Sequence, residues 1–259
     1  MYAVSVLGTD TERVVSRLAA AAEGRVGTVR VETADTDGGI AKSHSETEYV
    51  VGDSWRASGG GLSVSDTLDR LAPDHEYAFV LGAPKTRLPT VTVGDDHDDA
   101  LVSVVDASDI DPAAILEIIR ETEPYETLES LVASVKQSEK APYSGAIATF
   151  TGRVRAKEDE DDERTRYLEF EKYDGVAEDR METIESELED RKGVLDVRLH
   201  HRTGRIPDGE DIVFVVVLAG HRKEAFTAVE DGIDRLKDEV PLFKKEVTDE
   251  ETFWVHERE

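Results

Sequence analysis

The chain contains no cysteine among its 259 residues. Disulfide bonds and thiolate metal sites are therefore excluded, and any sulfur chemistry must use sulfur that another molecule brings. No apolar run approaches the roughly 20 residues of a membrane-spanning helix. The opening residues, Met1–Gly8, lack the basic segment that begins a signal peptide. We therefore expect a soluble, cytoplasmic protein with no membrane partner.

Positive charge is also scarce. The chain has 31 Lys+Arg against 58 Asp+Glu, a formal net charge of -27. An electrostatic field of that sign repels nucleic acid, so we expect no nucleic-acid partner. Concentrated salt shortens the Debye length and makes dense carboxylates tolerable. We interpret the acidity as adaptation to high salt, with an acidic binding surface as the alternative.

Basic clusters lie in the second half of the chain, where predicted elements end. They are Arg153 with Arg155, His221 with Arg222, Lys237, and Lys244 with Lys245. Such grouping in so acidic a chain indicates an anionic ligand. Arg153 and Arg155 flank Val154, so they share one side of an extended strand; the alternative is an exposed strand end whose arginines pair with acids.

His221 and Arg222 lie between a predicted buried strand, 211–218, and a predicted helix, 224–240. The free amides and partial positive charge of a helix N-terminus bind phosphate, and arginine adds a bidentate donor. The alternative is a capping histidine beside a surface arginine.

Lys237 comes late in this helix, next to an apolar stripe of Phe226, Val229, Ile233 and Leu236. A lysine there can lose solvent and act as a general acid or base, or it can extend into water. Lys244 follows the break at Pro241 and can turn back toward the same pocket. We expect the basic clusters to converge on one anion site.

No metal site is expected. His200 and His201 are adjacent, and neighbouring residues on a strand face opposite ways, so the two cannot easily chelate one ion. We expect one of them to be structural.

The first half begins with a predicted strand (2–7), a loop after Gly8, a helix (12–22) and a strand (27–32). This order opens phosphate-binding-loop domains. However, Thr9 to Arg13 do not supply the required Gly-Lys-Ser/Thr. We predict a decayed, non-hydrolysing domain, or a structural α/β module that binds no nucleotide.

The remaining elements are predicted from hydrophobic periodicity. Residues 33–63 are expected to be mostly loop, and Asp111 should cap a helix over 112–118. A boundary near residue 122 separates a first domain, 1–122, from a second, 123–259. The second mixes strands and helices without βαβ alternation and is therefore α+β. Its expected elements are helices 130–135, 176–188 and 224–240, strands 146–151, 194–200, 211–218 and 253–256, and an exposed charged loop, 157–166.

The basic clusters belong to longer strings that occur in a fixed order. They are Gly145-Ala-Ile-Ala-Thr-Phe-Thr-Gly-Arg-Val-Arg155, Leu168-Glu-Phe-Glu-Lys-Tyr-Asp-Gly175, His201-Arg202-Thr-Gly204, Ala219-Gly-His-Arg222, Pro241-Leu-Phe-Lys-Lys-Glu246 and Trp254-Val-His-Glu-Arg-Glu259. Together they resemble the catalytic, large subunit of molybdopterin synthase over residues 123–259. Arg205 departs from the pattern, where the family usually has an acid. The first half resembles the molybdopterin-guanine dinucleotide accessory GTP-binding protein.

The resemblance implies an α/β-hammerhead fold for the second domain and a sulfurtransferase activity. The implied substrate is cyclic pyranopterin monophosphate, which receives two sulfurs to become the molybdopterin dithiolene. The implied donor is a small ubiquitin-like carrier whose C-terminal Gly-Gly ends in a thiocarboxylate. A homodimer would stand at the centre of a heterotetramer, and its sites would draw on both subunits. No cofactor is implied.

The resemblance also assigns roles to residues. It implies catalysis by Lys237 and Lys244. It implies substrate binding by Arg153, Arg155, His221, Arg222, Lys245, Glu246 and Arg258. Two alternatives stay open: a non-catalytic adaptor that docks the carrier, and a nucleotide-binding accessory protein that acts through the first half.

Overall fold

A computed structural model describes residues 1–31, 47–83, 86–94, 99–160, 162–173, 175–248 and 252–255. The chain divides into two compact units, Met1–Glu126 and Thr127–Glu259. The division falls later than residue 122 because the intervening segment is held by the N-terminus. The Tyr125 N–H donates to the Met1 carbonyl at 2.7 Å, and the Glu126 carboxylate lies 3.4 Å from the N-terminal amine.

Unit 1 is built on a five-stranded parallel sheet in the order β2-β5-β1-β6-β7. Its strands are β1 (Tyr2–Gly8), β2 (Val26–Arg30), β5 (Tyr77–Leu81), β6 (Thr90–Val93) and β7 (Val102–Val104); its helices are α1 (Thr11–Ala21), α2 (Val64–Leu71) and α3 (Pro112–Arg120). One face packs against α1 and α3, and the other packs against α2. Strand β5 is buried along its whole length, as expected for a parallel strand covered on both faces.

Three features of unit 1 differ from the sequence-based expectation, and the first is strand β7, which was not predicted. Part of the expected loop over 33–63 is a hairpin of β3 (Thr47–Val51) and β4 (Trp55–Gly59), and residues 33–46 lie outside the described residues. The glycines and serines around this segment led to the prediction of a loop, although the hairpin itself contains β-branched and aromatic residues that favour strands. Helix α2 was not predicted, although Ser63 and Asp66 form a capping box at its start. The predicted cap of α3 is confirmed, because Asp111 accepts from the N–H groups of Ala113 and Ala114 at 3.1 and 3.3 Å.

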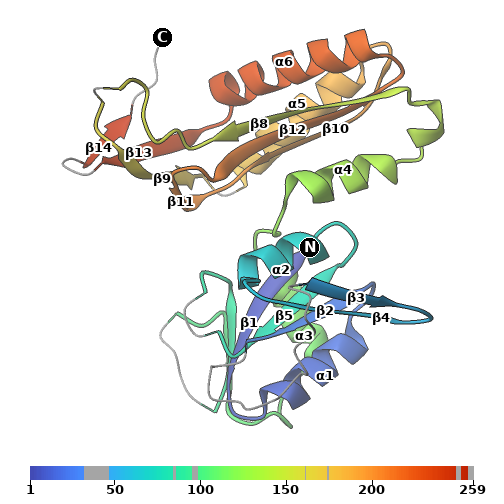
Figure 1. The fold of residues 1–259 in the computed structure, drawn as a ribbon, viewed down its shortest axis with the longest axis vertical. Helices are drawn as coiled ribbons and strands as arrows, with labels where there is room; N and C mark the ends of the chain where they lie inside the picture. Colours follow the sequence, from blue (N-terminus) through green and yellow to red (C-terminus); the bar gives the residue numbers. More distant parts are fainter. Residues whose placement is uncertain are drawn as a thin grey trace. The chain divides into compact units, whose positions relative to one another are not determined.

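Unit 2 combines two antiparallel sheets with three α-helices in a mixed α/β architecture (Figure 1). The strand orders are β10-β12-β8 and β11-β9-β13-β14. The strands are β8 (Ala146–Arg153), β9 (Thr165–Lys172), β10 (Val194–His201), β11 (Gly204–Pro207), β12 (Asp211–Ala219), β13 (Leu242–Thr248) and β14 (Thr252–Val255). The helices are α4 (Leu128–Lys136), α5 (Val176–Glu189) and α6 (Arg222–Glu239), with a 3-10 turn at Ala141–Tyr143.

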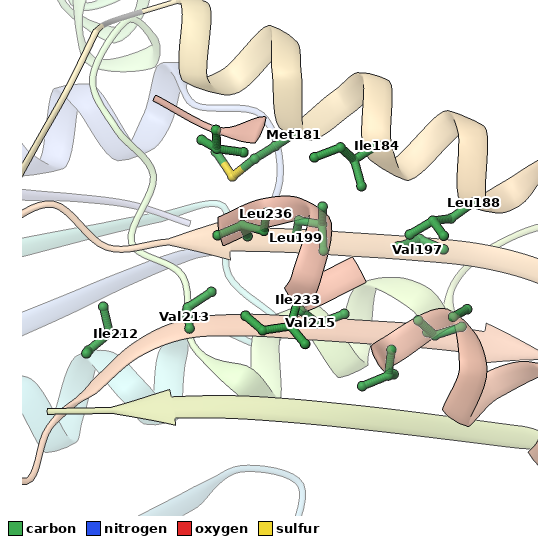
Figure 2. Close-up of a cluster of buried hydrophobic side chains, with 14 of the residues drawn as sticks. Met181, Ile184, Leu188, Val197, Leu199, Ile212, Val213, Val215, Ile233 and Leu236 are labelled. Carbon is green, nitrogen blue, oxygen red and sulfur yellow. The ribbon is translucent and has the colours of Figure 1, made fainter. Parts of the chain in front are cut away.

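Strand β12 is the centre of unit 2 and is buried on both faces. Val213, Val215 and Val217 point into the core beneath α5 and α6, whereas the alternate residues Phe214, Val216 and Leu218 pack against α4. Figure 2 shows the first of these cores, with Met181, Ile184 and Leu188 of α5 lying over Val197 and Leu199 of β10. This confirms the buried strand predicted over 211–218 and the apolar face predicted for 176–188.

The predicted stripe on α6 was wrong at one position. Phe226 is 66% exposed, and the buried face consists of Ala225, Ala228, Val229, Gly232, Ile233 and Leu236. Small residues let α6 approach β12 closely: a Cβ added at Gly232 would lie 3.1 Å from Val215 Cγ1. The helix therefore turns its smallest side chains toward the sheet, and Phe226 is rotated outward.

Three strands of the second sheet, β9, β11 and β13, were not predicted as strands. They are short or rich in charge, and their pairing joins distant segments of the chain. No helix among the described residues is both long and apolar enough to cross a bilayer.

Candidate active site

His221 and Arg222 form a corner at the start of α6, which we call the His-Arg corner. His221 is the N-cap residue, Arg222 is the first helical residue, and both side chains are exposed. The Gly145 N–H donates to the Ala219 carbonyl at 3.0 Å, which holds the start of β8 beside this corner. The location at a helix N-terminus agrees with the prediction and suits an anion.

Arg153 and Arg155 lie at the other end of β8, on either side of the buried Val154. Arg153 Nε is 3.0 Å from Asp211 Oδ1, and Arg155 Nη1 donates to Glu158 Oε1 at 2.8 Å. The arginines thus pair with acids at an exposed strand end. Exposed pairs of this kind contribute about 0–1 kcal/mol, so an incoming phosphate can displace the acids.

Lys244 and Lys245 point to opposite faces of β13. Lys244 is opposite Phe170, on the sheet face that contributes to the core, whereas Lys245 is opposite Glu169. Lys245 Nζ lies 3.2 Å from Glu169 Oε2. A single ligand above one face of the sheet therefore cannot meet both amines directly.

Glu246 connects β13 to the segment that carries Arg155. Its carboxylate accepts a hydrogen bond from the Thr165 hydroxyl, and the Thr165 N–H donates to the Ala156 carbonyl at 2.8 Å. These contacts place Glu246 and Arg155 at the same end of unit 2. Arg258 lies outside the described residues.

Lys237 lies in the last turn of α6 and is exposed. Of the two alternatives left open for Lys237, the structure of the single chain agrees with extension into water, because Leu236 takes the buried position and Lys237 is the next residue around the helix. Arg235 fixes this turn: its Nε donates to Glu239 Oε1 at 2.8 Å, and that contact lowers the pKa of Glu239. Arg180 of α5 also donates to Glu239.

The structure separates the predicted site residues into two groups. We call Arg153, Arg155, Lys237, Lys244, Lys245 and Glu246 the lysine-arginine end. Strand β12 connects this end, where Asp211 pairs with Arg153, to the His-Arg corner, which follows Ala219. A nine-residue strand at about 3.3 Å per residue spans about 26 Å. The predicted convergence of all basic clusters is therefore wrong within one chain.

Comparison with known proteins adds to this geometry. A sequence model of the MoaE protein family matches residues 121–239. A probable molybdopterin synthase of Haloferax volcanii is 49% identical over 265 aligned positions, which cover 100% of both chains. The chain belongs to the molybdopterin synthase family.

Other members of the family match about half of the chain. The molybdopterin synthase catalytic subunit of Pyrococcus abyssi is 40% identical over 129 residues, which cover 49% of this chain and 82% of that protein. A solved molybdopterin synthase structure from Staphylococcus aureus has 32% sequence identity and a TM-score of 0.46, and covers 52% of this chain and 93% of that chain. The MoaE match ends before β13, whereas the Haloferax synthase aligns with the whole chain, including unit 1 and Lys244.

Two residues near Lys244 in the sheet were missed by the sequence analysis. Lys172 precedes the turn between β9 and α5, has a side chain only 10% exposed, and lies 2.5 Å from Glu178. Tyr173 packs edge-on against Phe243, the residue before Lys244, with ring centroids 5.3 Å apart. The string Leu168 to Gly175 contains Lys172 and Tyr173, but only the pairing of β9 with β13 places Lys172 opposite Leu242, two residues before Lys244.

The two adjacent histidines and Arg205 each pack against an aromatic ring. His201 is buried and packs edge-on against Phe170, and His200 stacks on Phe214. Within the described residues, no group of three or more His, Cys, Asp and Glu residues could hold a metal ion. Arg205, the departure from the family pattern, lies over the Tyr167 ring at 3.5 Å.

Unit 1 has a short loop where a phosphate-binding loop would stand. Only Thr9 and Asp10 separate β1 from α1, whereas the nucleotide-binding motif is the longer G-x-x-x-x-G-K-[ST]. The Thr9 N–H donates to the Val93 carbonyl at 3.0 Å, and Glu12 pairs with Arg30 at 3.1 Å. A Cβ added at Gly8 would lie 1.9 Å from the Val93 oxygen. The close approach of β6 is therefore sufficient reason for a glycine at this position, without a bound phosphate.

Proposed function

We propose that this chain is the large subunit of a molybdopterin synthase, an enzyme of molybdenum cofactor biosynthesis. It transfers sulfur from a thiocarboxylated, ubiquitin-like carrier to cyclic pyranopterin monophosphate and forms the molybdopterin dithiolene. The observation that carries this proposal is the 49% identity to a probable molybdopterin synthase over 100% of both chains. The absence of cysteine agrees with a sulfur donor that comes from outside the chain.

The lysine-arginine end supplies the reacting groups in this proposal. Lys237 is exposed and can transfer protons to and from the substrate, and Lys244 assists from β13. Arg153 and Arg155 exchange their weak surface pairs for the substrate phosphate. Glu246 holds the strand that carries Lys244, and Lys245 keeps the β9–β13 pairing in place through Glu169.

The His-Arg corner completes the site from a second copy of the chain. A gap of about 26 Å along β12 is far beyond the reach of hydrogen bonds of about 3 Å to one small molecule. A homodimer in which each copy offers its corner to the other removes this gap. The carrier would present its Gly-Gly tail near Tyr173 and Phe243, which are 60% and 42% exposed beside Lys244.

Unit 1 is proposed to be a structural module that does not hydrolyse nucleotide. Its short loop, the use of the Thr9 N–H by β6 and the pairing of Glu12 with Arg30 support this proposal. A relationship to the molybdopterin-guanine dinucleotide accessory protein rests on the sequence resemblance alone.

The test is conversion of cyclic pyranopterin monophosphate by the purified full-length chain with a thiocarboxylated carrier. We expect dithiolene product, and we expect no product with a carrier that ends in an ordinary carboxylate. The adaptor alternative predicts carrier binding without product. If an active carrier binds but no product forms, the enzyme proposal is refuted and the adaptor alternative is supported.

A further inference from the structure

The two lysines to which catalysis is assigned lie on either side of a tight bend. Lys237 is in the last turn of α6, and Lys244 is in β13, which begins at Leu242. Only Val240 and Pro241 join the two elements, and the Leu242 N–H donates to the Val240 carbonyl at 2.9 Å. We call this junction the α6–β13 bend. The mutual position of the two amines depends on how firmly the bend is held.

The helix side of the bend is held by two arginines. A last helical turn tends to fray, because its final carbonyl groups have no partner within the helix. In α6, however, Glu239 of this turn accepts hydrogen bonds from Arg180 of α5 and from Arg235, whose Nε donates at 2.8 Å. Arg235 and, to a smaller extent, Arg180 lower the pKa of Glu239, so this carboxylate keeps its charge at neutral pH. The last turn of α6 is thereby tied to the second turn of α5.

The strand side of the bend is held from the same part of α5. Glu178, two residues before Arg180, places Oε1 2.5 Å from the Lys172 amine, and its Oε2 accepts from the Gly175 N–H at 2.9 Å. Lys172 ends β9 and lies opposite Leu242, the first residue of β13. An ammonium group as nearly buried as that of Lys172 is costly unless it is paired. This ion pair therefore fixes the end of β9 to the start of α5.

The sheet geometry brings this ion pair close to Lys244. Lys172 is opposite Leu242 and Phe170 is opposite Lys244, so the two lysines are diagonal neighbours on one face of the β9–β13 pair. Residues in this relation are about 7–8 Å apart, which is within reach of long side chains. A displacement of Lys172 at the end of β9 is therefore passed to the strand that carries Lys244.

We propose that Glu178 and Arg180 of α5 form a brace that positions Lys237 and Lys244 relative to each other for sulfur transfer. Glu178 acts on the strand side of the bend through Lys172, and Arg180 acts on the helix side through Glu239. Both are positioning residues, because they act through other residues and need no contact with the substrate. The inference rests on the proposed function for the reaction, whereas the brace itself is measurable without substrate.

Amide hydrogen exchange of the full-length chain tests the brace directly. The variants are Arg180→Gln and Glu178→Gln. The matched control is Glu187→Gln, because Glu187 of α5 also pairs with Arg235 but lies farther along the helix from the bend. For Arg180→Gln we expect about 10-fold faster exchange over residues 236–240, since a lost charged hydrogen bond favours local opening. Residues 228–233, in the middle of α6, should not change.

The same measurement examines the strand side. In Glu178→Gln, faster exchange should appear over residues 242–244, and the control Glu187→Gln should leave both segments unchanged. Exchange at the bend that is unchanged in both variants overturns the brace. Equal acceleration along the whole of α6 also overturns it, because that result describes general loosening of the helix.

Kinetics separates positioning from stability at a temperature where every variant is folded. A misplacement of about 1 Å can cost about 100-fold in rate, so we expect Arg180→Gln to lower kcat by about 10- to 100-fold. The KM for the precursor should stay within about twofold, because the phosphate-binding arginines lie on another segment. Arg180→Lys keeps the charge and should recover most of the kcat, and Glu187→Gln should match the unchanged chain.

A pair that only stabilises unit 2 predicts a normal kcat in folded Arg180→Gln, and that result overturns the positioning role. An equal loss of kcat in Glu187→Gln overturns it as well. The two measurements also separate this inference from the proposed function. If the unchanged chain forms no product with an active carrier, the proposed function falls, while hydrogen exchange at the bend still decides whether the brace exists.

Discussion

Glu185 provides a sharp test of the packing between α5 and the β10 edge. Burial raises its pKa to about 7, although the Leu199 N–H and Arg198 act in the opposite direction. The folded chain thus holds this proton over a pH range in which the unfolded chain, with an ordinary pKa of 4.5, has lost it. Stability must therefore fall as the pH rises from about 4.5 through about 7.

The size of the effect follows from the shift. A difference of about 2.5 pKa units corresponds to about 3.4 kcal/mol at most. Glu185 is only partly buried by accessible area, and solvent screening reduces this figure. We expect Glu185→Gln to raise the free energy of unfolding at pH 8 by about 1–3 kcal/mol. The amide oxygen still accepts from the Leu199 N–H, so the substitution removes the buried charge and keeps the hydrogen bond.

The measurement is urea unfolding at pH 5 and pH 8. Trp55 belongs to unit 1 and Trp254 to unit 2, so a Trp55→Phe background reports on unit 2 alone. Glu182→Gln, on an exposed position of the same helix, is the matched control and should change little at either pH. The gain for Glu185→Gln should fall at pH 5 to about a quarter of its value at pH 8. An equal gain at both pH values, or a loss at pH 8, would refute the reasoning.

Further predictions concern catalysis, unit 1 and the turn before α5. Lys237→Ala should lower dithiolene formation by about 100-fold or more, as expected for loss of a general acid or base, with an unchanged melting curve. Lys192→Ala is the exposed control. Normal yield from a folded Lys237→Ala chain would show that this lysine is not catalytic. The full-length chain should not hydrolyse GTP with magnesium, because the loop after Gly8 is short and lacks lysine; magnesium-dependent turnover would contradict this. Glu178→Gln should weaken unit 2 by about 1–3 kcal/mol in urea unfolding, because the nearly buried Lys172 loses its ion pair with Glu178. Glu171→Gln, on an exposed position, should not weaken it.

The sequence by itself determined the elements whose signals are local. Asp111 and Pro112 mark the start of α3 because a cap and its helix are neighbours in the chain. The run Asp211–Ala219 indicates a strand buried on both faces because it contains almost no polar residue. The ordered strings around Arg155, Arg222 and Lys244 indicated the family that the full-length match to the Haloferax synthase now establishes.

Only the tertiary structure decided how these elements meet. The stripe on α6 was misplaced because the close approach of Gly232 to Val215, not side-chain hydrophobicity, sets the face that α6 buries. Lys172 comes opposite Leu242, two residues before Lys244, only through the pairing of β9 with β13, whose residues are far apart in sequence. In the sequence each basic cluster lies at the end of a strand or helix, which suggested that all of them meet. Two of the clusters, however, lie at opposite ends of β12. The length of β12 keeps those ends about 26 Å apart, and the order of residues in the chain gives no sign of that separation.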